Sequence, residues 1–484
     1  MLDVLIIGAG LSGIGAARHL QRRCPGKSFE IVEARDRIGG TWDLFRYPGV
    51  RSDSDMYTLG YGFKPWRGDR AIAEGAEILA YLNETVDEAG LRDRIRFGHA
   101  VKSASWSGAD ACWTVRAERG NDGDVVEWRA RFLFVCSGYY RYDAAHRPDF
   151  PGEADFAGRI VVPQFWPQQL DVAGRRVVII GSGATAVTLG PALARAGAQV
   201  TLLQRSPSYV VALPSRDRLA PLLQRMLPPR AANAVLRWKN LAFTGFVYRL
   251  ARRRPNSVRK RLIAMAEQLC GPDGAAAIHF APRYAPWDQR VCVAPDGDLF
   301  RGIREGRISV VTEAIDRFVA DGVRLASGRE LAADIVVVAT GIELRALGDI
   351  ELHLDGSRFN VSQALLYKGA MLGDVPNLAL TFGYVNASWT LKADLTAGFV
   401  CRLLQAMDRR NAVAVVARRQ PDVGTEPLMP LSSGYVQRGA ALLPRQGSRA
   451  PWRVAQSYVR DLLAIRFGRL DDGVLKFVAA AQKA

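Results

Sequence analysis

Residues 4–13 read Val4-Leu5-Ile6-Ile7-Gly8-Ala9-Gly10-Leu11-Ser12-Gly13. The apolar run predicts a buried strand, the GxGxxG spacing predicts a tight turn, and a helical pattern follows through Leu20. Gly8 permits the turn, Gly10 lets backbone amides approach a pyrophosphate, and Gly13 allows close packing of the helix on the strand. The stretch is typical of a dinucleotide-binding Rossmann unit.

An acidic residue supports this interpretation. Glu33 ends the next predicted strand, Phe29 to Val32, twenty residues after Gly13. A carboxylate at this place accepts hydrogen bonds from ribose hydroxyls.

A second unit of the same kind begins at Val177. Its strand leads through Gly181-Ser182-Gly183-Ala184-Thr185-Ala186 into a helix, and alanine is a permitted variant at the third position. The next strand ends in Gln204-Arg205-Ser206 with no acid. Because arginine pairs with a 2′-phosphate that a carboxylate would repel, Arg205 favours NADPH over NADH; the alternative is a solvated arginine at a strand end.

Two such units predict an α/β protein with two Rossmann-type dinucleotide-binding domains. We expect residues 1–145 and 331–484 to form the first domain in two segments, the second of which includes the C-terminal region. Residues 146–330 would form the second domain, with a helical insertion at about 213–275. Pro228-Pro229 predicts a break within that insertion.

Composition narrows the class of protein. The chain has 484 residues, 49% of them hydrophobic and 23% charged, which suits a folded protein of two or three domains. It shows neither a secretion signal nor an apolar run of roughly 20 residues. The six cysteines are scattered, with no CxxC pair, so we expect a cytoplasmic protein with reduced thiols, no metal site and no redox-active dithiol.

Positive charge is concentrated in the predicted insertion. Residues 216–261 hold thirteen basic residues against Asp217 alone, which accounts for twelve of the seventeen excess charges. Two interpretations stay open: a solvated helical face whose apolar side packs on the second domain, or peripheral association with the anionic inner face of a membrane. No nucleic-acid motif accompanies the charge, so no nucleic-acid partner is expected.

Residues 39–53 identify the chemistry through a resemblance. They resemble the type I Baeyer-Villiger monooxygenases of the flavin-containing monooxygenase superfamily, whose pattern is met by Gly39, Gly40, Trp42, Tyr47, Pro48, Gly49 and Asp53. The linker motif of that family is met by Phe156, Gly158, Trp166 and Pro167. The match continues through Trp287-Asp288-Gln289-Arg290, residues 386–392 and Pro451-Trp452-Arg453, and is closest to the ethionamide-activating branch.

The resemblance implies an FAD- and NADPH-dependent Baeyer-Villiger monooxygenase, with FAD in the first domain and NADPH in the second. Such enzymes use O2 to form a C4a-peroxyflavin, which inserts one oxygen atom next to a ketone carbonyl to give an ester or lactone. Thioethers or thioamides would also be S-oxygenated. The expected substrates are small lipophilic ketones or sulfides, and the oligomeric state is left open.

By the same resemblance, Arg290 is the catalytic cation and Asp53 the acid that orients it. Arginine suits this role because its pKa above about 12 makes it a poor proton donor. The structural alternatives are an arginine that bridges the domains and an acid that caps a turn. The expected contacts with FAD are Gly8, Gly10, Ser12, Gly13, Glu33, Gly40, Thr41, Trp42, Asp43, Leu44 and Val101, with Asp53 near the flavin ring. Arg51 and Ser52 are expected near the nicotinamide end of NADPH, and Gly181 to Val187, Arg205 and Ser206 around the rest of that dinucleotide. Trp389 and Lys392 are further candidates for the pocket, although Trp389 could equally pack in the core.

Two other functions stay open. A flavin-containing N- or S-monooxygenase would form sulfoxides or N-oxides without esters, although Trp166-Pro167 argues against it because that sister group carries Tyr or Phe in place of the tryptophan. A flavoprotein that binds both nucleotides without oxygenating would act as a sensor or scaffold, which the intact Asp53 and Arg290 argue against.

The chain departs from the family's linker motif at Val162, where that motif has a histidine. We expect Val162→His to raise the share of NADPH oxidation that ends in oxygenated product and to lower release of hydrogen peroxide, since valine can neither hydrogen-bond nor titrate. Product and peroxide are measured per NADPH consumed. Unchanged ratios in the variant would contradict this expectation.

Overall fold

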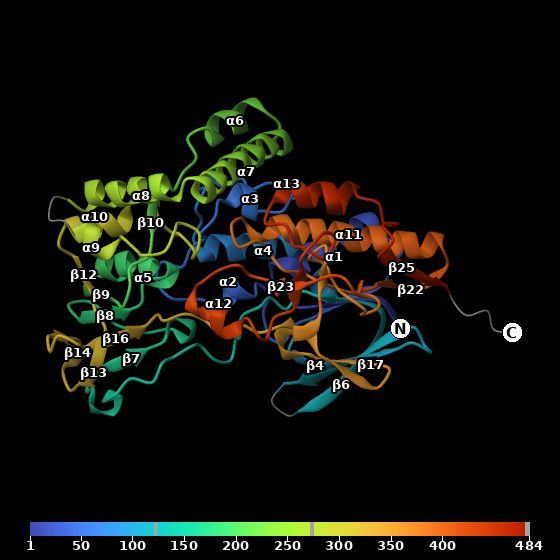
Figure 1. Ribbon diagram of the computed structural model, residues 1–484, viewed down its shortest axis with the longest axis horizontal. Coiled ribbons are helices and arrows are strands. Elements are labelled where there is room, and N and C mark those ends of the chain that lie inside the picture. Colours follow the sequence, from blue (N-terminus) through green and yellow to red (C-terminus); the bar gives the residue numbers. More distant parts are fainter. Residues whose placement is uncertain (121–122, 272–274, 480–484) are drawn as a thin grey trace.

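The computed structural model describes residues 1–120, 123–271 and 275–479. Two α/β bodies lie side by side, one around the sheet that contains β8 and β9 and the other around the sheet that contains β4 and β6 (Figure 1). A layer of helices, α6 to α8, crosses one side of both bodies.

The first sheet has the order β18-β17-β4-β5-β6-β1-β2-β3, with β21, β20 and β19 joined beside β6. Its strands are β1 (Leu2–Ile7), β2 (Phe29–Val32), β3 (Ile95–Arg96), β4 (His99–Ser107), β5 (Cys112–Arg119), β6 (Asp124–Val135), β17 (Glu351–Leu354), β18 (Ser357–Phe359), β19 (Leu366–Tyr367), β20 (Met371–Leu372) and β21 (Leu378–Leu380). Segments from both ends of the chain therefore share this sheet.

Strand β1 is the buried centre of the first sheet. It pairs in parallel with β2 on one side and with β6 on the other, and Val4, Leu5 and Ile6 are inaccessible to solvent. A parallel strand covered on both faces requires a continuous apolar run, which explains the sequence pattern. Beyond the glycine turn, α1 (Leu11–Arg23) packs against α11 (Trp389–Arg409).

The second sheet is parallel throughout, in the order β12-β9-β8-β16-β7. Its strands are β7 (Arg159–Val161), β8 (Arg176–Ile180), β9 (Gln199–Gln204), β12 (Ile308–Thr312) and β16 (Ile335–Val338), and α5 (Ala184–Arg195) follows β8. The predicted fold class, two Rossmann-type units in an α/β protein, is confirmed.

One predicted boundary needs correction. The limit between residues 330 and 331 separates β16 from the sheet to which it belongs, because β16 pairs with both β7 and β8. The second sheet therefore extends to Val338, and the chain leaves it only at Ala339. The other domain limits stay predictions.

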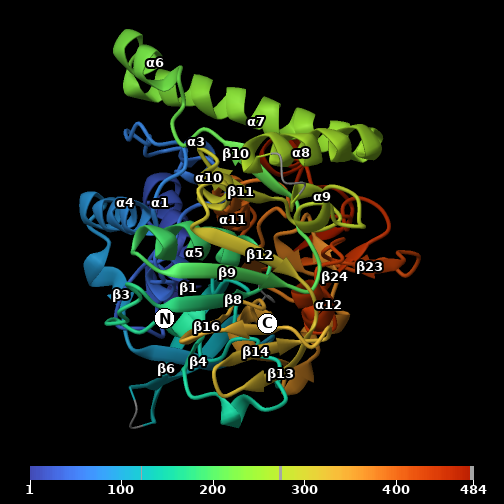
Figure 2. The same ribbon diagram turned by 90° about the vertical axis from the view of Figure 1, so that its left-hand side faces the viewer.

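The helical insertion lies between β10 (Val210–Leu213) and β11 (Cys292–Pro295), which pair with each other. Its described helices are α6 (Ala220–Met226), α7 (Pro229–Arg253), α8 (Pro255–Cys270) and α9 (Ala275–His279). The break predicted at Pro228-Pro229 separates α6 from α7, since proline suits the first position of a helix but not its interior. In Figure 2, α6 and α7 lie on the outer side of this helical layer, away from the two sheets.

The remaining elements connect these parts. They are α2 (Thr41–Leu44), α3 (Met56–Leu59), α4 (Gly75–Glu88), η1 (Arg92–Arg94), η2 (Glu153–Asp155), η3 (Pro163–Phe165), α10 (Asp298–Arg304), β13 (Ile315–Val319), β14 (Gly322–Leu325), β15 (Glu330–Ala332), η4 (Leu347–Asp349), η5 (Val361–Gln363), β22 (Ala412–Ala417), β23 (Thr425–Pro427), α12 (Gly434–Gly439), β24 (Arg445–Gly447), α13 (Tyr458–Asp461), η6 (Leu462–Phe467) and β25 (Leu475–Ala479). None of the helices in residues 1–120, 123–271 and 275–479 has the length and apolar character needed to cross a membrane.

Helix α7 is anchored on the first body. Arg237 donates hydrogen bonds to the carbonyl oxygens of Tyr57, at 3.2 Å, and Gly60, at 2.8 Å. The amide of Asn240 donates to Asp55 at 2.9 Å, and Leu236 is buried in the same small core as Tyr57. One of the two interpretations of the insertion places its apolar side on the second body. Helix α8 fits this interpretation because it contacts α10 and β10. Helix α7 does not fit it, because α7 packs on the first body.

A buried ion pair joins α11 to α13. The ammonium of Lys392 lies 2.7 Å from the carboxylate of Asp461, and both side chains are buried. The ammonium also donates to the carbonyl of Lys368 at 3.0 Å, and the hydroxyl of Tyr384 donates to Asp461 at 2.7 Å. Lys392 is thus a structural residue and not, as the sequence indicated, a pocket candidate.

We expect Lys392→Met to lower the free energy of unfolding by about 3–5 kcal/mol, because it leaves the Asp461 carboxylate buried without a countercharge. Denaturant unfolding followed by far-UV circular dichroism measures the change. The control is Arg410→Met at the exposed pair Arg410–Asp471, for which a loss below about 1 kcal/mol is expected. Equal losses in the two variants would contradict the assignment.

Candidate active site

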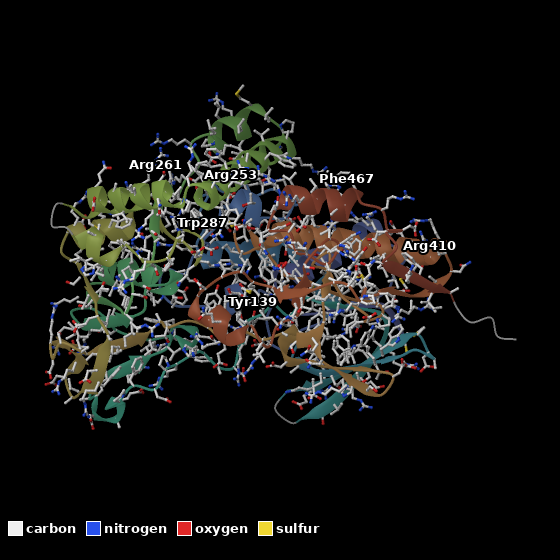
Figure 3. All side chains as sticks on the ribbon, in the orientation of Figure 1. Tyr139, Arg253, Arg261, Trp287, Arg410 and Phe467 are labelled. Carbon is white, nitrogen blue, oxygen red and sulfur yellow. The ribbon has the colours of Figure 1, made fainter. Side chains whose placement is uncertain are left out.

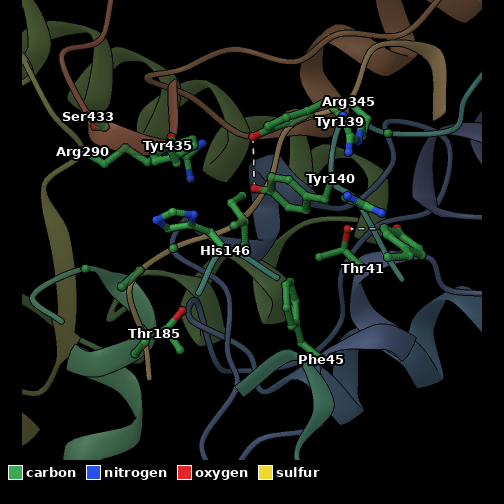
Figure 4. Close-up of a pocket in the computed structure, with 18 of the residues that line it drawn as sticks. Thr41, Phe45, Tyr139, Tyr140, His146, Thr185, Arg290, Arg345, Ser433 and Tyr435 are labelled. Atoms are coloured by element: carbon green, nitrogen blue, oxygen red, sulfur yellow. Dashed lines mark hydrogen bonds between the residues drawn. The ribbon is translucent and has the colours of Figure 1, made fainter. Parts of the chain in front are cut away.

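The two glycine turns open into one cavity of about 1140 Å³. Gly8 and Gly10 contribute to it from the first body, and Gly181 and Gly183 from the second. Each turn follows the carboxyl end of a central parallel strand, where ligands of open α/β sheets bind. Figure 4 shows side chains from both bodies gathered around this cavity.

Gly8 and Gly13 of the first turn have no space for a side chain. Gly8 has a φ of +101°, and a Cβ there would lie 2.7 Å from the carbonyl oxygen of Cys136. At Gly13 a Cβ would meet the carbonyl oxygen of Gly8 at 1.8 Å, so this glycine serves helix–strand packing. Gly10 faces Gly40, whose Cα would lie 3.5 Å from an added Cβ. The wall at this turn is backbone, which suits the close approach of a pyrophosphate.

Glu33 lies beside this turn. Its carboxylate accepts hydrogen bonds from the backbone N–H groups of Ala9, at 2.6 Å, and Arg35, at 3.0 Å. Burial raises the pKa of Glu33, and these donors oppose that rise. A cavity-lining acid next to a glycine wall fits the adenosine end of FAD.

The second turn is more open. Gly181 has a φ of +144°, and its Cβ would collide with the carbonyl of Ala339, whereas a Cβ at Gly183 would meet nothing within 4 Å. Arg205 lines the cavity, is exposed, and forms no ion pair with any carboxylate among the residues described. An open glycine turn with a free guanidinium beside it fits a dinucleotide that carries a 2′-phosphate.

Arg290 and Asp53 meet at the cavity wall. The guanidinium Nη1 of Arg290 donates to the Asp53 carboxylate at 2.8 Å, and its buried Nε has no hydrogen-bond partner within the described part of the chain. Burial, the largest single influence, lowers the pKa of Arg290, but Asp53 and the neighbouring tyrosines together outweigh burial and raise that pKa above its ordinary value. The cavity wall therefore holds a permanent cation.

The loop that carries Arg290 is held from outside the cavity. Trp287 has a φ of +68°, uncommon for a bulky residue. Asp288 accepts a hydrogen bond from Arg252 of α7 at 2.7 Å, and its carbonyl accepts from the N–H of Ser432 at 2.9 Å. The ring of Trp287 also packs edge-on against Tyr248 of α7, with centroids 6.3 Å apart. Helix α7 thus positions this loop.

Three tyrosines at this wall were not predicted from sequence. The hydroxyls of Tyr139 and Tyr140 lie 3.1 Å apart (Figure 4), and burial raises the pKa of Tyr140. Burial also raises the pKa of Tyr435 to about 12. These two phenols are neutral at pH 7 and can donate hydrogen bonds. None of the three lies within a stretch that a family motif marks, so no sequence signal selected them.

His146 also lines the cavity. It lies in the segment that leads from the first body to the second, and its carbonyl accepts a hydrogen bond from Thr340 on the returning segment at 3.0 Å. Burial and the nearby Arg438 lower the pKa of His146, so its imidazole is neutral at pH 7. Its position sixteen residues before Val162 gives no sequence signal that it shares the cavity.

Trp389 lines the cavity, as expected, and its indole N–H donates to the hydroxyl of Ser12 at 2.7 Å. Its ring stacks on Tyr139 with centroids 5.1 Å apart. The indole therefore forms an aromatic wall next to the first turn.

Most of the predicted site residues line the cavity. They are Gly8, Gly10, Ser12, Glu33, Gly40, Thr41, Trp42, Arg51, Ser52, Asp53, Val101, Gly181, Ser182, Gly183, Ala184, Thr185, Arg205, Ser206 and Arg290. The structure does not bring Gly13, Asp43, Leu44, Ala186 and Val187 to it.

Ion pairs and core packing keep several of these residues away from the cavity. Asp43 is buried in ion pairs with Arg35, at 2.6 Å, and with Arg46, so arginines and not a ligand satisfy its carboxylate. Ala186 and Val187 face the core beneath α5. They pack in the core of the second body and do not line the cavity.

Arg51, which we expect near the nicotinamide, also links the two bodies. Although it lines the cavity, its guanidinium forms two hydrogen bonds with the carboxylate of Asp298 in α10, at 2.6 and 3.3 Å. It therefore joins the two bodies beside Asp53.

Comparisons with known proteins agree with this geometry. Residues 6–69 match the NAD(P)-binding Rossmann-like domain, and residues 71–234 match the family described as flavin-binding monooxygenase-like. The FAD-containing monooxygenase EthA of Mycobacterium tuberculosis is 50% identical over 478 residues, which cover 98% of this chain and 97% of that protein. The chain belongs to the FAD-containing monooxygenase family.

Other relatives of this FAD-containing monooxygenase are similar over their whole length. The probable FAD-binding monooxygenase AlmA of Acinetobacter sp is 46% identical and covers 98% of this chain, 96% of its own. A solved steroid monooxygenase bound to NADP shares the fold with a TM-score of 0.77 at 22% identity, covering 99% and 100% of the two chains. A cyclohexanone monooxygenase bound to ε-caprolactone has a TM-score of 0.73 at 20% identity, covering 98% and 99%. The predicted enzyme class, a flavoprotein monooxygenase, is confirmed, and the predicted cofactors FAD and NADP agree with these comparisons.

We propose that Arg205 of this FAD-containing monooxygenase binds the 2′-phosphate of NADPH. Arg205→Gln is expected to raise the KM for NADPH roughly 10- to 100-fold, the effect of losing one hydrogen bond to a charged group, and to leave the KM for NADH unchanged. Steady-state kinetics with both nucleotides measure the effect. Arg175→Gln, at an exposed arginine outside the cavity lining, is the control, and a parallel rise for both nucleotides would argue against the assignment.

Proposed function

We propose that this protein is an FAD- and NADPH-dependent Baeyer-Villiger monooxygenase. It would insert one oxygen atom of O2 next to a ketone carbonyl to give an ester or lactone, and would also S-oxygenate thioethers or thioamides. The observation that carries the proposal is the pair formed by Arg290 and Asp53 at 2.8 Å, on the wall of a cavity shared by two dinucleotide turns.

The atoms of the reaction balance. NADPH and a proton supply two electrons and two hydrogens, one oxygen atom of O2 enters the organic product, and the other leaves as water. FAD bound at the first turn would supply the chemistry that passes electrons from NADPH to O2. A protein that does this must hold a positive charge where negative charge develops on oxygen.

Arg290 meets this requirement. Its guanidinium stays protonated throughout the pH range of catalysis, so it stabilises an oxygen anion without giving up its own proton. Asp53 holds one side of the guanidinium through Nη1 and fixes its orientation. The side of the guanidinium away from Asp53 is left to interact with a bound ligand, and its buried Nε has no hydrogen-bond partner among the described residues.

The neutral phenols support the same chemistry. With pKa values raised by burial, Tyr140 and Tyr435 keep their protons, and so add no negative charge beside Arg290. Aromatic side chains at the cavity, among them Phe45 and Trp389, exclude water and suit a small lipophilic substrate.

The alternative is an N- or S-monooxygenase that forms no esters. The match of residues 71–234 to the flavin-binding monooxygenase-like family keeps it open, and Val162 in place of the linker histidine weakens the resemblance to both groups. The two functions differ in product. Purified yellow protein is incubated with NADPH and a cyclic ketone or a thioether, and products are identified by gas chromatography and mass spectrometry. Lactone supports the proposal, sulfoxide with no lactone supports the alternative, and NADPH oxidation without either product contradicts both.

We expect Arg290→Ala to lower the rate of lactone formation by at least about 100-fold, the cost of removing one preorganised donor from developing charge. The variant should still bind FAD and should release hydrogen peroxide, because the dinucleotide turns are intact. Lactone, peroxide and the flavin spectrum are measured together, with Arg175→Ala as control. Lactone formation at the unchanged rate in Arg290→Ala would exclude this role for the guanidinium.

A further inference from the structure

Exposed apolar side chains gather on one side of the molecule. In the described part of the chain, ten of the sixteen large hydrophobic residues that stand exposed belong to two segments. They are Leu219, Leu222, Met226, Val235, Trp238, Phe243 and Phe246, at α6, α7 and the residue before α6, and Val459, Leu463 and Phe467, in α13 and η6. We name α6, α7, α8, α13 and η6 together the basic face.

Helix α7 presents two different sides. Ala232, Leu236 and Arg237 are buried against the first body, whereas Val235, Trp238 and Phe246 are 46%, 49% and 63% exposed. The spacing of this second set, three and then eight residues, places it on one stripe of a helix. An apolar stripe that faces solvent, on a helix already anchored by its other side, has no role in the core.

The two apolar segments lie side by side. The rings of Trp238 in α7 and Tyr458 in α13 pack edge-on with centroids 6.0 Å apart. Figure 1 places α6, α7, α8 and α13 along one side of the molecule, and in Figure 3 Arg253, Arg261 and Phe467 lie on that side. Segments more than 200 residues apart in sequence therefore build one continuous surface.

Unpaired positive charge surrounds the apolar side chains. Nine of the thirteen basic residues between 216 and 261 form no ion pair with a carboxylate among the described residues. They are Arg218, Arg225, Arg230, Arg249, Arg253, Arg254, Arg259, Lys260 and Arg261. Arg460 and Arg466 extend this charge beside Phe467. The acid of the segment, Asp217, is already paired with Lys239.

We propose that the basic face docks on the surface of an anionic lipid bilayer. The cations are attracted to acidic headgroups, and the apolar side chains between them enter the boundary between headgroups and acyl chains. A second copy of this chain would bring the same positive charge against it. A nucleic acid would match the charge but offers no apolar phase for Leu222, Met226 and Leu463.

Co-sedimentation of the holoenzyme with vesicles tests the proposal. Vesicles of phosphatidylcholine alone are compared with vesicles that contain phosphatidylglycerol, at low and high salt. We expect binding to the anionic vesicles at low salt, little binding to the neutral ones, and release at about 1 M salt, where the Debye length falls to about 3 Å. Absence of binding to anionic vesicles at low salt, or equal binding to both compositions, would overturn the proposal.

Two sets of variants separate the charge from the apolar contribution. Arg249→Glu combined with Arg253→Glu should weaken binding to anionic vesicles by more than about tenfold, since each basic residue near such a surface contributes several-fold. Phe243→Ser combined with Phe246→Ser should weaken it by a similar factor, because two large apolar side chains no longer enter the bilayer.

The controls alter matched residues elsewhere. Arg175 and Arg329 are exposed arginines without an ion pair among the described residues, and Val125 is 66% exposed on β6. Arg175→Glu combined with Arg329→Glu, and Val125→Ser, should bind vesicles as the parent does, and every variant is checked for its flavin spectrum and NADPH oxidation in solution. Equal losses in test and control variants would show nonspecific attraction and overturn the proposal. So would light scattering in which the phenylalanine variant converts a dimer into a monomer, because the face would then join two copies of the chain.

Discussion

The contact between Arg290 and Asp53 is the interaction on which the site depends, because its two members come from different bodies of the molecule. Asp53 follows the first dinucleotide turn, and Arg290 lies 237 residues later, after the helical insertion. The pair between Arg51 and Asp298 crosses the same boundary two residues from Asp53. The position of the cation is therefore a property of how the two sheets are held together, and not of either Rossmann unit alone.

The units themselves could be predicted from sequence because their signals are local. Buried parallel strands need unbroken apolar runs, the turns need glycine where a Cβ would strike a carbonyl oxygen, and the acid that follows lies at a set distance. Gly8, Gly13 and Glu33 satisfied these conditions, and the structure places them accordingly. Proline chemistry likewise predicted where α7 begins. The end of the second sheet was misplaced because the apolar strand 335–338 does not reveal which sheet it joins.

Long-range contacts account for what sequence did not predict. Asp43 lies in a stretch that resembles a cofactor-binding motif, yet two arginines take its charge. Tyr139, Tyr140 and His146 reach the cavity from a segment with no periodic pattern, so only their positions in space distinguish them. The insertion was recognised as helical and basic, but that α7 packs on α3 of the first body depends on Arg237 reaching backbone carbonyls, which no local pattern encodes.

The hydrogen bond from Arg252 to Asp288 has a consequence for how this chain can change over evolution. One helix carries the solvent-facing apolar stripe on one side and, through Arg252 and Tyr248, holds the loop that ends in Arg290. A chimera that carried the insertion of a distant relative would have a different outer surface and also different contacts with the loop that positions Arg290. A change to the exterior of α7 can therefore also change the position of Arg290.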